Sequence, residues 1–214
     1  MPISWMANLK SKLVVGAGDF LEIAFHAWKE KDPAIAVEKL EITQDENHSF
    51  DLGFLDGYLP EETSMFAAFD NRFLNFKRLE LMGAIKSRGF CMDAFIGGGA
   101  IVGAGVKIGE NSFVSEGAVI GAAAILQYNI YLGARAVVGY AAQIGHSAWI
   151  EAAVVLGRRA RIGAHTTLGL GVSVADNIQV GRMCLIEDPG QYCENIPAKT
   201  FCKPSFEGPI RIFN

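Results

Sequence analysis

Two histidines, His146 and His165, are the clearest candidates for acid–base chemistry, because a neutral imidazole takes up a proton near pH 7. They lie nineteen positions apart in the second half of the chain. Between them stand Arg158, Arg159 and Arg161, which bring three guanidinium groups within four residues. Guanidinium groups suit phosphate, so this cluster is either an anion-binding site or a solvated charged edge.

A turn near the start of the chain is a candidate ligand site. Residues 12–16 predict a strand that runs into the glycine turn Gly16-Ala17-Gly18, and residues 19–31 predict the helix that follows. This turn lets the backbone approach a ligand closely, although G-A-G is shorter than the full dinucleotide-binding fingerprint. Asp56 ends a second predicted strand over 51–56, where its carboxylate can accept hydrogen bonds from a base or a ribose.

The elements that must position these residues follow from a six-residue repeat. An aliphatic residue occupies every sixth position from Ile96 to Ile186, sixteen in a row, and glycine usually follows it. A period of six fits neither an α-helix nor simple alternation, but it fits one short strand and one tight turn per repeat. Three repeats make a coil of eighteen residues, and coils stack at the β spacing of about 4.8 Å. The sequence therefore predicts a left-handed parallel β-helix of just over five coils, with residue i under residue i+18.

Strand and helix signals alternate before the repeat. A third strand is predicted over 65–69, followed by a helix from about 71 to 88. This alternation favours a small parallel sheet of nucleotide-binding type. We therefore expect a mainly β protein, with a Rossmann-like α/β domain over 1–92, the β-helix over 93–190 and a C-terminal tail over 191–214.

Composition and charge exclude several classes of function. The net charge of −4 argues against nucleic acid or an anionic membrane as partner. No apolar run is long enough to span a bilayer, and the first ten residues lack a signal-peptide layout, so we expect a cytoplasmic protein. The cysteines form no C-x-x-C pair and no His/Cys cluster with zinc spacing, which predicts reduced thiols and no metal: Cys91, Cys184, Cys193 and Cys202.

Many positions predicted to face out of the β-helix are apolar. They are Ala122, Ala123, Ile125, Val137, Tyr140, Trp149, Ala152, Ala153 and Val155. An apolar outer wall usually marks an interface, so we expect a homotrimer packed along the coil axis. The alternative is that the N-terminal part of the same chain covers one face.

A small α/β domain followed by an unbroken hexapeptide helix resembles the nucleotide-sugar N-acetyltransferases of the bacillosamine type, also called sialic-acid O-acetyltransferase-like proteins. The matching stretches are V-V-G-A-G at 14–18, G-F-L-D at 53–56, A-A-F-D-N at 67–71 and I-G-H-S-A-W-I at 144–150. The resemblance implies an acyl-CoA-dependent N-acyltransferase in polysaccharide biosynthesis. Its donor would be acetyl-CoA, and its acceptor would be the amine of a UDP- or dTDP-linked amino sugar.

The resemblance also implies roles for individual residues. His146 matches the histidine that serves as general base, and the backbone amide of Ala164, eighteen residues later, would hold the developing oxyanion. The coenzyme would be bound by Arg158, Arg159, Arg161, Gly163 and His165, and the nucleotide sugar by Gly16, Ala17, Gly18 and Asp56. For His165 the sequence leaves open a lone exposed histidine instead.

Three positions depart from the family pattern. The acidic residue that usually follows the histidine is Ser147, a second histidine is replaced by Val155, and an asparagine is replaced by Gly139. Two other functions therefore stay open, namely another small-molecule O- or N-acyltransferase and a non-catalytic trimeric scaffold or sugar-nucleotide-binding protein. A carbonic anhydrase of the γ class needs three zinc histidines, whereas the repeat holds only two.

Overall fold

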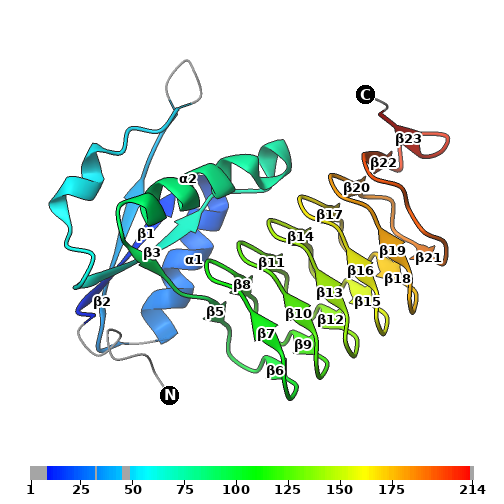
Figure 1. The fold of residues 1–214 in the computed structure, drawn as a ribbon, viewed down its shortest axis with the longest axis horizontal. Coiled ribbons are helices and arrows are strands. Elements are labelled where there is room, and N and C mark those ends of the chain that lie inside the picture. The colour runs from blue at the N-terminus through cyan, green and yellow to red at the C-terminus, as the bar shows by residue number, and fades with distance from the viewer. Residues whose placement is uncertain (1–8, 32, 45–48, 213–214) are drawn as a thin grey trace. The chain divides into compact units, whose positions relative to one another are not determined.

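The computed structural model describes residues 9–31, 33–44 and 49–212 (Figure 1). The chain forms two compact units, one that holds residues up to 72 together with 77–93, and one that holds 73–76 together with 94–214. Within the described ranges, no helix is both long enough and apolar enough to cross a membrane.

The first unit is built on a parallel sheet of four strands in the order β2-β1-β3-β4. The strands are β1 (Ser11–Gly16), β2 (Ala36–Glu41), β3 (Thr63–Ala68) and β4 (Cys91–Met92), and the helices are α1 (Gly18–Lys31) and α2 (Phe76–Ser87). The central strands β1 and β3 are almost entirely buried, as parallel strands covered on both faces are.

The predicted strand over 51–56 is wrong. Residues Gly53–Gly57 form the short 3₁₀-helix η2, and the second strand is β2. The local reason is a turn in which the Asp51 side chain accepts a hydrogen bond from the Gly53 amide at 2.9 Å. Strand β2 could not be recognised in the sequence, because it is a largely exposed edge strand with many charged residues, A-V-E-K-L-E. The predicted helix from about 71 also begins later, since η3 (Arg72–Asn75) precedes α2.

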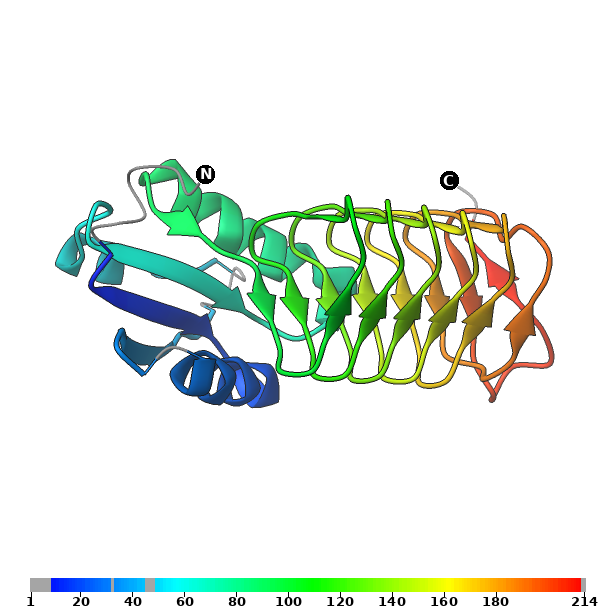
Figure 2. The same ribbon diagram turned by 90° about the horizontal axis from the view of Figure 1, so that it is seen from below.

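The second unit is a parallel β-helix of two-residue strands (Figures 1 and 2). Its strands are β5 (Phe95–Ile96), β6 (Ile101–Val102), β7 (Lys107–Ile108), β8 (Phe113–Val114), β9 (Val119–Ile120), β10 (Ile125–Leu126), β11 (Tyr131–Leu132), β12 (Val137–Val138), β13 (Gln143–Ile144), β14 (Trp149–Ile150), β15 (Val155–Leu156), β16 (Arg161–Ile162), β17 (Thr167–Leu168), β18 (Ser173–Val174), β19 (Gln179–Val180), β20 (Leu185–Ile186) and β21 (Gln191–Tyr192).

These strands stack into three sheets, each of which contains every third strand. One sheet runs β7-β10-β13-β16-β19, a second runs β6-β9-β12-β15-β18-β21, and the third runs β5-β8-β11-β14-β17-β20. Within the predicted tail, β22 (Thr200–Cys202) and β23 (Ile210–Arg211) extend the third sheet. The register is the predicted eighteen residues, as in the pairing of Ile144 with Ile162. The left-handed β-helix preceded by a small α/β domain, expected from the sequence, is therefore confirmed.

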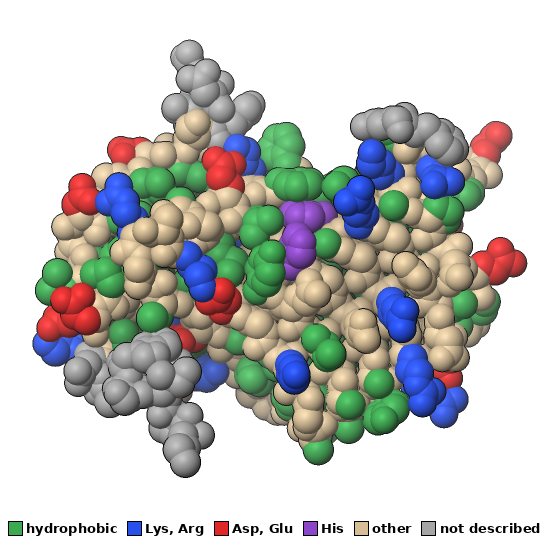
Figure 3. Space-filling model, viewed as in Figure 1, with side chains coloured by type: hydrophobic (Ala, Val, Ile, Leu, Met, Phe, Trp, Pro, Cys, Tyr) green, Lys and Arg blue, Asp and Glu red, His purple; other side chains and the backbone are tan. Residues whose placement is uncertain are grey.

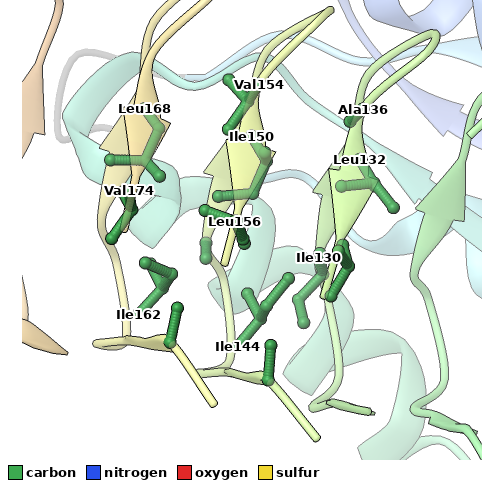
Figure 4. Packing of buried hydrophobic residues seen from close by; sticks show 14 of the residues in the cluster. Ile130, Leu132, Ala136, Ile144, Ile150, Val154, Leu156, Ile162, Leu168 and Val174 are labelled. Atoms are coloured by element: carbon green, nitrogen blue, oxygen red, sulfur yellow. The ribbon is translucent and has the colours of Figure 1, made fainter. Parts of the chain in front are cut away.

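The inward aliphatic residues form one continuous core (Figure 4). From Val114 to Ile186 every sixth residue is at most 3% exposed, and corner alanines such as Ala142 and Ala148 are completely buried. The prediction is wrong for Ile96 and Val102, which are 36% and 41% exposed. They belong to the first coil, where β5 and β6 pair with a following coil only, so one side of each has no stacked neighbour.

The predicted apolar outer wall divides into two different surfaces. One is an aromatic ladder on the third sheet, in which Phe95, Phe113, Tyr131 and Trp149 stack in sequence. Trp149 was predicted to face outward on this wall, yet it is only 6% exposed. The other surface is a stripe along β6-β9-β12-β15, made by Ile101, Val119, Val137 and Val155 one above another. We call these four residues the aliphatic stripe, and Ile101, Val137 and Val155 in it are exposed.

Glycines after the inward aliphatic residues allow neighbouring coils to approach, which gives a test of the fold. A Cβ on Gly121 would lie 2.8 Å from the backbone nitrogen of Tyr140, whereas a Cβ on Gly98 meets nothing within 4 Å. Gly121→Ala should therefore lower the free energy of unfolding in urea by about 1–3 kcal/mol, as overpacking does. The matched Gly98→Ala should change it by less than about 1 kcal/mol. Equal effects of the two substitutions would contradict this account of the coil spacing.

Candidate functional site

His146 lies in the turn between β13 and β14, and its backbone is fixed from two sides. Its amide donates a hydrogen bond to the side-chain oxygen of Gln127 at 3.0 Å. Its carbonyl accepts one from the amide of His165 at 3.0 Å. Because the coils stack, the first contact comes from the preceding coil and the second from the following one.

The imidazole of His146 lies between two other rings. The Tyr128 ring is nearly parallel to it, with centroids 5.0 Å apart, and the His165 ring is nearly perpendicular to it at the same centroid distance. The Nδ1 atom of His146 is buried and has no hydrogen-bond partner among the described residues. Burial lowers the pKa of His146 from its ordinary 6.5, so the ring is neutral and able to accept a proton near pH 7.

His165 is not the exposed histidine that the sequence left open, because only 5% of its surface is accessible. Its Nδ1 is 2.8 Å from the carbonyl oxygen of Leu74, and its ring stacks on Phe76 at a centroid distance of 3.9 Å. Burial lowers the pKa of His165, and the nearby His146 lowers it further, whereas the Leu74 carbonyl acts in the opposite direction.

Ser147, which stands where the family has an acidic residue, belongs to a buried polar ladder. The Asn111 amide donates to the side-chain oxygen of Asn129, and the Asn129 amide donates to the Ser147 hydroxyl, at 2.8 and 2.9 Å. The Ser147 carbonyl accepts a further bond from the Asn75 side chain at 3.0 Å. Among the described residues no hydrogen bond joins Ser147 to the His146 ring, so Ser147 does not replace the missing carboxylate.

The backbone amide of Ala164 lies one coil after His146, against Gly145. A Cβ on Gly145 would come 2.5 Å from the Ala164 nitrogen, which shows how closely the two turns approach. The amides at the same point of two other repeats are capped by side chains, His146 by Gln127 and Arg158 by Asp176. No such cap is found for Ala164 in the part of the chain that the structure describes. This N–H is therefore available to an oxygen of a ligand.

A groove of about 610 Å³ runs along the outer face of the sheet that contains β13 and β16. Its lining includes Gln127, Gly145, Arg161, Gly163 and Arg182, together with the loop 195–198. The groove thus passes the glycines that precede both His146 and Ala164. Figure 3 shows histidine side chains on the surface with hydrophobic side chains beside them.

The three arginines predicted to act together are separated by the structure. Arg161 lines the groove. Arg158 is paired with Asp176, its guanidinium 2.7 Å from the carboxylate, and its hydrogen bonds hold the pKa of Asp176 below the usual value. Arg159 lies over the Tyr140 ring, 5.6 Å from its centroid. Arg158 is therefore already neutralised, whereas Arg161 faces the groove.

The glycine turn of the first unit has two different roles. Gly16 is required by packing, because a Cβ there would lie within 2 Å of the Ala68 carbonyl oxygen on β3, at 1.8 Å. Gly18 has a φ of 70° and begins α1, at the carboxyl end of β1. Asp56 lies in η2 instead of at the end of a strand, and its carboxylate is 2.8 Å from the guanidinium of Arg88.

Sequence reasoning missed the residues that surround the two histidines. Tyr128 could have been found, since it lies eighteen positions before His146 and the register places it beneath that ring. The contacts of Leu74, Asn75 and Phe76 had no such signal, because these residues precede the repeat. Among the residues that the structure describes, no three His, Cys, Asp or Glu side chains gather as metal ligands would.

Comparisons with known proteins match this fold. The family model for bacterial transferase hexapeptide (six repeats) matches residues 91–122, and no curated protein sequence matches the chain. The acetyltransferase domain of PglB from Neisseria gonorrhoeae FA1090 is 21% identical, with 90% of this chain and 95% of that chain covered and a TM-score of 0.78. The same domain in complex with acetyl coenzyme A is 19% identical over the same shares, with a TM-score of 0.68.

A third solved structure extends the comparison to a sugar substrate. PerB from Caulobacter crescentus, in complex with CoA and GDP-perosamine, is 19% identical, with 89% of this chain and 92% of that chain covered and a TM-score of 0.52. At the level of the fold, these structures confirm the resemblance to nucleotide-sugar N-acetyltransferases that the sequence predicts.

The lowered pKa values of His146 and His165 predict a loss of stability in mild acid. Their folded-state pKa values lie below the ordinary 6.5, so the unfolded chain binds protons more readily. The stability that their neutral forms contribute is complete above that value and is lost as the pH falls through the window below it. The free energy of unfolding should therefore decrease as the pH falls below about 6.5.

Substitutions of the histidines separate this effect from that of other groups. His165→Asn should flatten the pH dependence of urea unfolding. A pH dependence unchanged by His165→Asn would show that another group causes the acid effect.

Proposed function

We propose that the protein transfers an acyl group, acetyl in the simplest case, from an acyl-CoA thioester to the amine of a nucleotide-linked amino sugar. The observation that carries this proposal is the pairing of a neutral, backbone-anchored His146 with the uncapped Ala164 amide one coil away, beside a groove. The fold supports it as well, since similar structures were solved with acetyl coenzyme A, and with CoA and GDP-perosamine.

His146 is assigned the role of general base. The amine nitrogen of the acceptor attacks the thioester carbonyl, and Nε2 of His146 takes up the proton that the nitrogen loses. The Ala164 N–H donates a hydrogen bond to the oxygen that becomes negative in the tetrahedral intermediate. When that intermediate collapses, the C–S bond breaks, and the proton on His146 neutralises the leaving thiolate.

The transfer is direct, without a covalent intermediate on the protein. Cys184 is buried in the β-helix core, and burial raises the pKa of its thiol. A thiol with a raised pKa supplies little thiolate near pH 7 and is a poor nucleophile. Cys202 has a raised pKa for the same leading reason.

The coenzyme is assigned to the groove, with Arg161 and Gly163 as its contacts. Arg182 on the same lining adds a second guanidinium that sequence reasoning did not consider. Arg158 and Arg159 are weaker candidates, because their guanidinium groups already contact the Asp176 carboxylate and the Tyr140 ring, respectively. The burial of His165 argues against a direct contact between its ring and the coenzyme.

The nucleotide of the acceptor, UDP or dTDP, is assigned to the turn Gly16-Ala17-Gly18. The turn connects the carboxyl end of β1 to the N-terminus of α1, a position at which α/β sheets bind phosphate groups. Asp56 stays a candidate contact, although it must exchange its ion pair with Arg88 for the nucleotide. Such substrates fit the cytoplasmic location and the role in polysaccharide biosynthesis that the sequence predicts.

His146→Ala tests this chemistry. Removal of a general base typically lowers the rate about 10²–10⁴-fold, so kcat for transfer from acetyl-CoA to UDP- and dTDP-amino sugars should fall by that factor. The measurement is release of free CoA thiol, with His26→Ala as a control of unchanged activity. Wild-type turnover of His146→Ala would overturn the mechanism, and a wild-type protein inactive with every acceptor would favour the non-catalytic trimer.

The homotrimer is assigned to the aliphatic stripe. Its β-branched residues form an apolar band along the coil axis, as expected of a surface that a second copy covers. Val155→Arg should turn a trimer of 23.1 kDa chains into smaller species in light scattering at micromolar concentration, because an unpaired charge would be buried in the interface. Glu30→Arg on exposed α1 should leave the mass unchanged. A monomeric wild-type protein would rule out this assembly.

A further inference from the structure

Three consecutive residues before α2 have left-handed backbone conformations without any glycine. Phe73, Leu74 and Asn75 have φ values of 52°, 50° and 61°. Such conformations are unfavourable for bulky side chains such as Phe and Leu, and they persist where neighbouring contacts fix them. We call residues 73–75 the left-handed segment, and together with Phe76 they belong to the same compact unit as the β-helix.

Leu74 and Asn75 of the left-handed segment, and Phe76 directly after it, contact the histidine region. The Leu74 carbonyl accepts a hydrogen bond from His165 at 2.8 Å, and Asn75 donates to the Ser147 carbonyl at 3.0 Å. The Phe76 ring lies parallel to the His165 ring within 10°. The unusual backbone therefore presents one carbonyl and one ring face to His165.

The Leu74 contact determines which nitrogen of His165 carries the proton. A backbone carbonyl can only accept a hydrogen bond, so Nδ1 must be the donor. Neutral His165 is therefore the Nδ1–H tautomer, and its ring is held by that bond and by the Phe76 stack. It cannot rotate without breaking one of them.

The ring contacts of His146 are with Tyr128 and His165, and Ser147 stands where the family pattern has an acidic residue. The Nδ1 of His146 has no hydrogen-bond partner among the described residues, and the Ser147 hydroxyl accepts from Asn129. The contacts that restrict its ring are the parallel Tyr128 ring in the preceding coil and the perpendicular His165 ring in the following coil. With both in place, the His146 imidazole has one ring contact in each neighbouring coil.

We propose that His165 is a positioning residue, held by the Leu74 carbonyl and the Phe76 ring, whose own ring orients the His146 imidazole for proton transfer. The inference rests on the proposed acyl transfer, since it assigns His165 to the base of that reaction. It removes His165 from the coenzyme contacts and gives the left-handed segment a function in the β-helix.

His165→Asn tests the proposal with little disturbance of the fold. Asparagine tolerates the φ of 57° at this position, and its amide can still donate to Leu74, but it has no ring. The variant should lower kcat about tenfold and leave KM for both substrates within about twofold, because only the orientation of the base is lost. Met183→Asn, at the equivalent position one coil later with a φ of 56°, is the matched control and should keep wild-type kcat.

His165→Phe covers the case in which the asparagine variant fails to fold. It keeps a ring beside His146 and Phe76 but loses the bond to Leu74, so it should retain part of the wild-type kcat whether or not His165→Asn folds. Circular dichroism establishes that each variant is folded. A folded His165→Asn with wild-type kcat, or with a raised KM for the coenzyme and an unchanged kcat, would overturn the proposal.

A spectroscopic measurement keeps this test independent of activity. With ¹⁵N-labelled histidine, His165 should appear as a single Nδ1–H tautomer near pH 7, and the His146 ring should show one set of signals that broadens or doubles in His165→Asn. An Nε2–H tautomer of His165, or an unaltered His146 ring in the variant, would refute the positioning role. If the wild-type protein transfers no acyl group, the proposed function fails, and these spectra alone decide whether His165 orients His146.

Discussion

The backbone hydrogen bonds between successive coils are the interaction on which the rest of the structure depends. They repeat with little variation, as when the Gly145 amide donates to the Ile162 carbonyl at 2.8 Å and the Gly163 amide donates to the Val180 carbonyl at 2.8 Å. Each coil is too small to bury its own aliphatic residues, so its core exists only when coils are stacked. The stacking also fixes the neighbours of every outward side chain. The histidine site is a consequence of this register, because His146 gains Tyr128 from one coil and His165 from the next.

The turns of the β-helix contain strained backbone conformations, and the contacts between coils offset their energetic cost. Ser147, Arg159 and His165 all have left-handed φ values near 56° at the same point of the repeat. A left-handed residue other than glycine costs roughly 1–2 kcal/mol. Asparagine lowers that cost, and Asn111 and Asn129 occupy this point in two coils. Their buried side chains also satisfy one another, so the polar ladder stabilises the same turns that carry the site.

The β-helix could be predicted almost residue by residue, because an aliphatic residue recurs at every sixth position and each hexad has a similar environment. The α/β unit was predicted less well, since neither of two elements follows a repeating pattern. Strand β2 is an exposed, charged edge strand, and the 3₁₀-helix η2 depends on the turn at Asp51. For the site, the register predicted the relation between His146 and Ala164. It did not predict the burial of His165, which depends on Leu74 and Phe76 from outside the repeat. The different environments of the three arginines also required the structure, because Asp176 contacts Arg158 and Tyr140 contacts Arg159.

The eighteen-residue register has a consequence for how such a chain can change its length. A deletion of one hexad between His146 and His165 would move all later strands to the next sheet, so that residues now above His146 would lie over a different face. Removal of a whole coil would keep every later residue on its own face. Loss of residues 111–128 would thus bring the segment 93–110 beneath His146 while leaving His165 above it. Near its site, the β-helix therefore tolerates insertions and deletions only in whole coils. Its length should change in steps of eighteen residues.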